Sequence, residues 1–103
     1  MRVYEIGDGG RWALLHADVE QACSALPAGL YDAVLCDPPY GLSFMGKRWD
    51  YDVPSVTLWA SVLRCLKPGA PILAFGGTRT YHRLVVNLED AGAEIRDQLQ
   101  WIY

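Results

Sequence analysis

The chain has little of what marks several common classes of protein. It contains three cysteines, an odd number without a C-x-x-C spacing, so neither a disulfide framework nor a cysteine zinc site is indicated. We interpret all three as reduced core residues and expect no metal site. The longest apolar runs, such as residues 33–36 and 71–75, fall far short of the roughly 20 residues that a membrane span requires. No apolar segment follows the first arginine as in a secretory signal, so we expect a cytoplasmic protein without a membrane anchor.

Basic side chains are not in excess either. Nine lysines and arginines face twelve aspartates and glutamates, which gives a formal net charge of −3. Nucleic-acid-binding proteins usually carry a basic patch, and the overall composition does not indicate one. With 103 residues, of which 51% are hydrophobic, the chain can form one globular domain with its own core. We therefore expect residues 1–103 to belong to a single domain.

Hydrophobic patterning predicts strands that alternate with helices. The predicted strands are residues 3–7, 12–18, 31–36, 70–77 and 93–103, and the predicted helices are residues 19–29, 56–66 and 79–92. The first two strands flank Asp8-Gly9-Gly10, a tripeptide that favours a tight turn because glycine tolerates a positive φ. Alternating strands and helices are typical of an α/β fold with a mostly parallel sheet flanked by helices.

Two loops follow buried strands in this pattern. Residues 37–40, Asp-Pro-Pro-Tyr, follow one strand, and residues 76–78, Gly-Gly-Thr, follow the next. In a parallel sheet the carboxyl ends of the strands lie on one edge, where ligands gather, so we expect these loops side by side. An isolated Asp-Pro pair would favour a simple proline turn capped by the aspartate, but the four residues together favour a functional loop.

The loop at residues 37–40 resembles the D-P-P-Y motif of DNA methyltransferases that modify exocyclic amino groups. The order of "DPPY", "LKPG" and "FGGTRTYH" is similar to that in the front part of phage and prophage enzymes of the beta arrangement, which place the D-P-P-Y half before the glycine-rich cofactor motif. The resemblance covers roughly residues 12–103. It implies a partial Rossmann-like fold and methyl transfer from S-adenosylmethionine to N6 of adenine or N4 of cytosine in DNA, with adenine preferred.

The resemblance also implies roles for individual residues. The catalytic residues would be Asp37, Pro38, Pro39 and Tyr40. The amino nitrogen is a poor nucleophile because its lone pair is delocalised into the ring, and two acceptors that bind its hydrogens would favour a reactive geometry. By resemblance, these acceptors are the Asp37 carboxylate and the Pro38 carbonyl, with the prolines fixing the backbone. Tyr40 would stack on the base after the base leaves the duplex.

Other residues near the two loops are candidates for the walls of the site. The expected base pocket comprises Tyr40, Phe44, Trp49, Tyr51, Gly76 and Thr78, and the expected nucleic-acid contacts are Lys47, Arg48, Arg79, His82 and Arg83. For Trp49 and Tyr51 the alternative is packing of the loop onto the core. His82 is also typical of an ordinary residue on a helix surface. We assign the three remaining tryptophans, Trp12, Trp59 and Trp101, to packing.

The cofactor site is only partly represented. The resemblance places Asp18 and Asp37 near S-adenosylmethionine, although Asp18 is equally suited to cap the following helix. "VYEIGDGG" superficially matches a glycine-rich cofactor loop, but only 26 residues separate Gly10 from Asp37, so we interpret it as a turn. The F-x-G-x-G loop of the family would follow residue 103. We therefore expect a truncated N-terminal portion that is inactive alone and partners with DNA and with its missing C-terminal half.

Two other functions remain open. An RNA or protein amide methyltransferase uses related [DN]-P-P-[YF] loops but needs a cofactor loop upstream, for which the 36 residues before Asp37 offer no room. A non-catalytic remnant or binding module would keep the base pocket without donor chemistry. The apolar end "LQWIY", expected as an edge strand, also predicts a marginally stable chain that aggregates readily.

Overall fold

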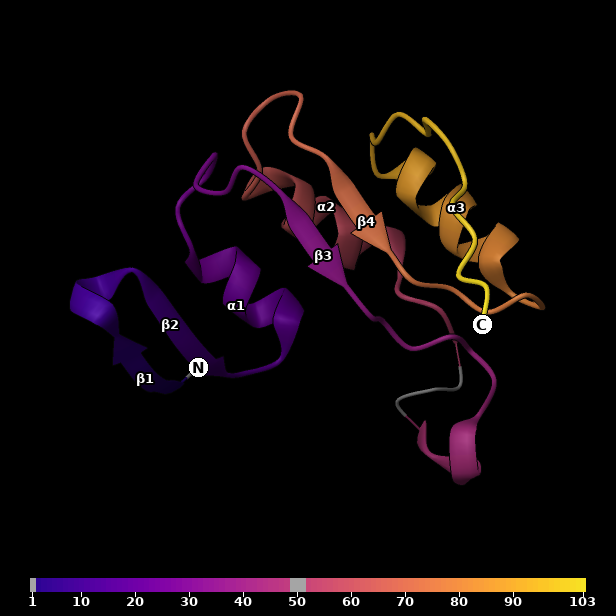
Figure 1. Ribbon diagram of the computed structural model, residues 1–103, viewed down its shortest axis with the longest axis horizontal. Helices are drawn as coiled ribbons and strands as arrows, with labels where there is room; N and C mark the ends of the chain where they lie inside the picture. The colour runs from indigo at the N-terminus through magenta and orange to yellow at the C-terminus, as the bar shows by residue number, and fades with distance from the viewer. Residues whose placement is uncertain (1, 49–51) are drawn as a thin grey trace.

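The computed structural model describes residues 2–48 and 52–103, and Figure 1 shows the course of the chain. The strands are β1 (Arg2–Gly7), β2 (Trp12–His16), β3 (Val34–Cys36) and β4 (Ile72–Ala74). The α-helices are α1 (Val19–Ala25), α2 (Val56–Arg64) and α3 (Tyr81–Asp90), and two short 3-10 helices are η1 (Asp8–Gly10) and η2 (Phe44–Gly46). The alternation of strands and helices therefore agrees with the predicted α/β class.

The strands form two separate sheets. β3 and β4 are parallel, with Leu35 opposite Leu73, and α2 lies between them in the sequence. β1 and β2 pair antiparallel as a hairpin that lies to one side of β3 and β4 in Figure 1. The parallel strand pair confirms the predicted strand-helix-strand unit. The predicted mostly parallel sheet is confirmed only for β3 and β4, because the predicted tight turn at η1 pairs β2 with β1 in a separate antiparallel sheet.

The turn between β1 and β2 uses a left-handed backbone. Asp8, Gly9 and Gly10 have φ values of 50°, 67° and 89°, which explains the two glycines. Trp12 pairs with Gly7 across the hairpin, and a Cβ on Gly7 would lie only 2.0 Å from the Trp12 ring. Trp12 is 47% exposed, so it packs on the hairpin without belonging to the core.

Side-chain caps fix where two helices begin. Asp18 Oδ1 accepts a hydrogen bond from the Gln21 amide at 3.1 Å, and Ser55 Oγ accepts one from the Leu58 amide at 3.1 Å. Both contacts satisfy an amide that would otherwise lack a partner in the first turn. α1 ends just before Pro27, because proline cannot continue the helical hydrogen-bond ladder.

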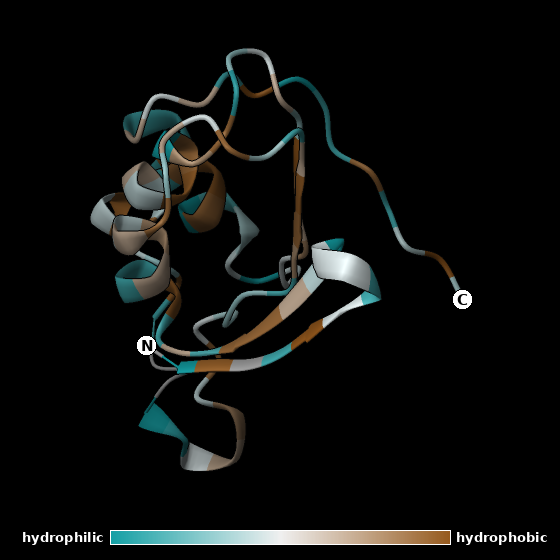
Figure 2. Cartoon of the chain, turned by 90° about the vertical axis from the view of Figure 1, so that its left-hand side faces the viewer, coloured by the Kyte–Doolittle hydropathy of each residue, from teal (hydrophilic) through white to brown (hydrophobic). Residues whose placement is uncertain are grey.

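The core lies between the helices and one face of the parallel sheet. Its buried residues are Val53, Trp59, Val62, Leu84 and Leu88, and Val34, Cys36, Ile72 and Ala74 of the sheet pack against them. Trp59 is 2% exposed, which confirms its packing role. The opposite face of the sheet is open, since Leu35 is 73% and Leu73 52% exposed. Figure 2 shows the helices on one side of these strands.

The last predicted strand, residues 93–103, is wrong: the structure assigns no strand there. Glu94 and Arg96 form an exposed ion pair at 3.5 Å at the start of this segment. Trp101 contacts Phe75 with ring centroids 5.9 Å apart but is 75% exposed, so it does not belong to the core. No helix within residues 2–48 and 52–103 is long and apolar enough to cross a membrane.

Candidate functional site

The two loops predicted to lie side by side do so. They leave the carboxyl ends of β3 and β4, and the Phe75 amide donates to the Cys36 carbonyl at 3.0 Å just where the strands end. Beyond this point a Cβ placed on Gly77 would lie 3.6 Å from the Tyr40 Cβ. The Asp-Pro-Pro-Tyr loop and the Gly-Gly-Thr loop are thus neighbours at one edge of the sheet, with space between Gly77 and Tyr40 for little more than a methyl group.

Asp37 and Tyr40 are joined within the first loop. The Tyr40 hydroxyl donates to Asp37 Oδ1 over 2.5 Å, a length typical of a hydrogen bond to a charged acceptor. This bond stabilises the neutral phenol, and together with desolvation and the nearby negative charge it raises the pKa of Tyr40 to about 12. Asp37 itself is exposed and Tyr40 half-buried. The carboxylate therefore faces solvent while it accepts a hydrogen bond from its own loop.

Thr80 connects the two loops and was not singled out in the sequence. Its hydroxyl donates to the Tyr40 carbonyl oxygen, which fixes the backbone of Tyr40 against the start of α3. Thr80 precedes α3 directly, yet its side chain makes no capping hydrogen bond to that helix. The available signal was a threonine at a predicted helix start, but a cap and a loop contact look alike in sequence.

Cys36 is the residue immediately before the loop. Its side chain is partly buried, and burial raises the pKa of the Cys36 thiol, with the adjacent Asp37 charge raising this pKa further. A neutral thiol is a poor nucleophile. The geometry therefore assigns the polar chemistry at this edge to the Asp37 carboxylate and the Tyr40 phenol, with Cys36 in a packing role.

The predicted pocket residues are only partly brought together. A Cβ on Gly76 would lie 3.2 Å from Leu84 Cδ2, so Gly76 faces α3. Phe44 lies in η2, which projects from the body at the lower end of Figure 1, and Lys47 and Arg48 follow it as exposed residues. Thr78 and Arg79 are exposed on the turn before α3. Trp49 and Tyr51 lie outside the described residues.

Asp18 lies at the start of α1, where its carboxylate caps the helix. This contact confirms the capping role, which was one of its two alternatives. Within residues 2–48 and 52–103, no group of three or more histidine, cysteine, aspartate or glutamate side chains is arranged to hold a metal ion. The cysteines in this part of the chain, Cys23, Cys36 and Cys65, are free thiols.

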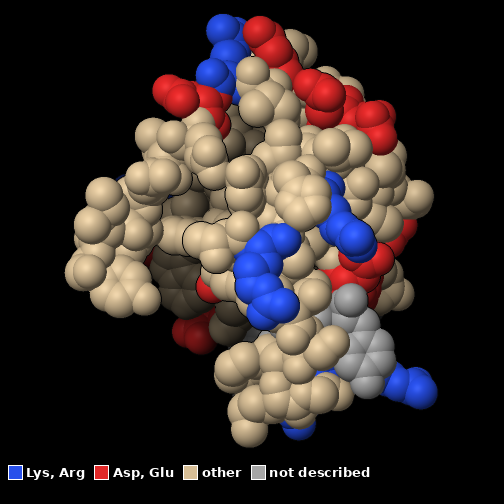
Figure 3. All heavy atoms as spheres, turned by 90° about the vertical axis from the view of Figure 1, so that its right-hand side faces the viewer, with Lys and Arg blue, Asp and Glu red and all other residues tan. Residues whose placement is uncertain are grey.

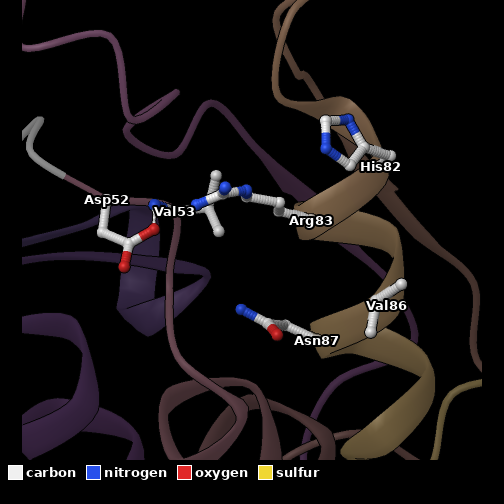
Figure 4. Close-up of a pocket in the computed structure, with 6 residues that line it drawn as sticks. All are labelled: Asp52, Val53, His82, Arg83, Val86 and Asn87. Carbon is white, nitrogen blue, oxygen red and sulfur yellow. Dashed lines mark hydrogen bonds between the residues drawn. The ribbon is translucent and has the colours of Figure 1, made fainter.

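A second feature lies beside the loops. A cavity of about 290 Å³ that is open to solvent lies between residues 52–53 and α3, and Figure 4 shows the side chains that line it. It is lined by Asp52, Val53, His82, Arg83, Val86 and Asn87. His82 and Arg83 were predicted nucleic-acid contacts, whereas Asp52 and Asn87 were missed because they are distant in sequence. Figure 3 shows basic side chains in the middle and at the lower end of the face that carries α3.

Comparisons with known proteins do not extend this description. No protein-family model, no curated protein and no solved structure matches the chain.

Proposed function

We propose that the chain forms the base-binding part of an S-adenosylmethionine-dependent DNA methyltransferase that modifies the N6 amino group of adenine or the N4 amino group of cytosine. The observation that carries the proposal is the position of Asp37 and Tyr40. They stand on one short loop after a strand of a parallel pair, and the neighbouring loop contacts Tyr40 through Thr80. This is the edge at which α/β sheets bind ligands.

The hydrogen bond between Asp37 and Tyr40 fits the chemistry of an amino group. Asp37 accepts a proton donor at 2.5 Å, and the exocyclic N–H of an extruded base is a donor of the same kind. In the proposed complex the base amino group replaces the phenol on Asp37, and the Pro38 carbonyl accepts its second hydrogen. The two acceptors would then orient the nitrogen lone pair toward the methyl donor.

Tyr40 is then released to stack on the base. Its carbonyl remains tied to Thr80, so the movement is confined to the side chain while the backbone of the loop stays in place. Stacking of a base on an aromatic ring contributes about 1 to 3 kcal/mol, which offsets much of the cost of extruding the base. An exposed carboxylate on a fixed loop is thus suited to capture an amino group from solution or from an opened duplex.

The described residues do not form a cradle for the methyl donor. Gly9 and Gly10 turn a β-hairpin instead of joining a strand to a helix, and Asp18 is engaged as a helix cap. S-adenosylmethionine would supply an activated methyl group, but residues other than these would have to hold it. The role of this loop is therefore base recognition, with Asp37 next to the site of transfer.

The proposal is tested by the selectivity of the chain for bases that carry an exocyclic amino group. We expect deoxyadenosine and deoxycytidine to shift the backbone amide NMR signals of Asp37, Tyr40 and residues 77–80, and thymidine to leave them unchanged, because thymine lacks an exocyclic amino group. Asp37→Asn should abolish this selectivity. Asp90→Asn, which removes the same charge from the exposed end of α3, is the matched control. Equal shifts with all three nucleosides would disprove the proposal.

A further inference from the structure

The cavity between residues 52–53 and α3 offers a distinct set of polar groups. Asn87 Nδ2 donates to the Pro54 carbonyl at 2.9 Å, which leaves its amide oxygen as an acceptor. Asp52 Oδ1 accepts the Val53 amide at 2.8 Å, which leaves the other carboxylate oxygen. In Figure 4 the Arg83 side chain extends from α3 toward Val53. No ion pair joins Arg83 to an acidic side chain in the part of the chain that the structure describes.

These groups suit one class of ligand. The guanidinium of Arg83 and the imidazole of His82 can donate to a phosphate, and arginine is well matched to phosphate oxygens. The free oxygens of Asp52 and Asn87 can accept from the amino edge of a base. Val53 and Val86 supply the apolar part of the lining. Hydrogen-bond donors for a phosphate, acceptors for a base and an apolar wall together fit a nucleotide. The cavity volume of about 290 Å³ is near the lower end of the range for small-molecule sites.

The cavity adjoins the loop that carries Asp37. Gly41, with a φ of 74°, packs against the backbone on which the cavity is built, since a Cβ there would lie 3.2 Å from the Val53 nitrogen. On the other side, Thr80 binds the Tyr40 carbonyl two residues before His82. Gly41 and the first turn of α3, which carries His82 and Arg83, therefore connect the cavity to the loop of the proposed base site.

We propose that this cavity binds the nucleotide next to the extruded base in the same DNA strand, with Arg83 and His82 at the phosphate. The inference rests on the proposed function, because it takes the Asp37 loop as the site of the extruded base. Enzymes that act on extruded bases commonly contact the flanking nucleotides, and such contacts set their sequence context. A nucleotide held here would give the chain a preference for particular neighbours of its target base.

The test compares deoxyadenosine with the dinucleotide d(ApA) in NMR titrations. The dinucleotide should bind about three- to tenfold more tightly than the nucleoside, because it adds one exposed charged contact and a base. Arg83→Gln should remove this gain and leave nucleoside binding unchanged, and Arg83→Lys should retain part of it. Arg96→Gln, which removes the same charge from the exposed pair with Glu94, should keep the full gain.

The outcomes separate the two proposals. A dinucleotide gain that survives in Arg83→Gln, or that is lost equally in Arg96→Gln, would overturn the nucleotide site while leaving the base site intact. The absence of any gain in the wild-type chain would overturn it as well. The proposed function alone requires that Asp37→Asn lose its selectivity between nucleosides. If this variant keeps that selectivity, the base site is overturned. The dispersion of the amide NMR spectrum verifies that each variant is folded.

Discussion

The phenol of Tyr40 donates a hydrogen bond to the carboxylate of Asp37 over 2.5 Å, and the backbone of Tyr40 is held in turn by Thr80. One oxygen of the only carboxylate in the Asp-Pro-Pro-Tyr loop thus accepts from a side chain three residues away. A ligand with an amino group would compete with the Tyr40 phenol for the Asp37 carboxylate. Which of the two binds depends on the strength of the hydrogen bond between Tyr40 and Asp37, which titration and denaturation can measure.

The first prediction concerns the titration of Tyr40. Its pKa of about 12 in the folded chain exceeds the value of about 10 for an unfolded tyrosine. The neutral phenol is the form that the fold favours, so this contribution to stability is fully present below about pH 10 and is lost as the pH rises through about 12. Between these values the urea midpoint of the wild-type chain should fall more steeply than that of Tyr40→Phe. Tyr81→Phe, at an exposed tyrosine of α3, should behave like the wild type.

Removal of the charge at Asp37 should act on the same tyrosine. Asp37→Asn replaces a charged acceptor with a neutral one, so the pKa of Tyr40 should fall toward its ordinary value. The measurement is a phenolate absorbance titration of wild type and variant, with Tyr40→Phe identifying the signal. An unchanged titration curve would mean that the hydrogen bond contributes nothing in solution.

The hydroxyl of Thr80, and not the shape of its side chain, should stabilise the fold. Thr80→Val keeps the branched side chain but leaves the half-buried Tyr40 carbonyl without this donor, at an expected cost of about 1 kcal/mol in the free energy of unfolding. Thr80→Ser restores the donor and should recover most of that loss. If serine and valine are equally destabilised in urea denaturation, packing and not hydrogen bonding holds the loop.

The capping role of Asp18 can be tested by substitution. Asparagine caps helices about as well as aspartate, so Asp18→Asn should leave the stability nearly unchanged, whereas Asp18→Ala should cost about 1 kcal/mol. Chemical denaturation of both variants provides the comparison. A large loss on Asp18→Asn would show that the negative charge, and not the cap, is what the chain uses at this position.

A lysine should destabilise the chain on one face of the parallel sheet and be tolerated on the other. Val34 packs against the core and its neighbour Leu35 is 73% exposed, so Val34→Lys should unfold the chain while Leu35→Lys changes its stability by less than about 0.5 kcal/mol. Leu35→Lys should also reduce self-association, because it places a charge on an open apolar face. Circular dichroism and sedimentation of the two variants test both statements.

Local chemistry explains which parts of the fold could be predicted. Asp18 and Ser55 mark helix starts because a side-chain oxygen next to a free amide is a short-range contact. The position of Asp37 after a buried apolar strand follows from the same kind of local pattern. The tight turn at Asp8 to Gly10 could be predicted as well, but patterning identifies strands without identifying their partners, so the division into two sheets could not.

The sequence by itself determined the helix caps, the turn at Asp8 to Gly10 and the placement of the Asp-Pro-Pro-Tyr loop at a strand end. Only the tertiary structure decided that residues 93–103 form no strand, that Thr80 binds the Tyr40 carbonyl, and that Asp52 and Arg83 line one cavity. The physical reason is the distance along the chain: Thr80 and Tyr40 are 40 residues apart, and such contacts depend on how the strands and helices pack.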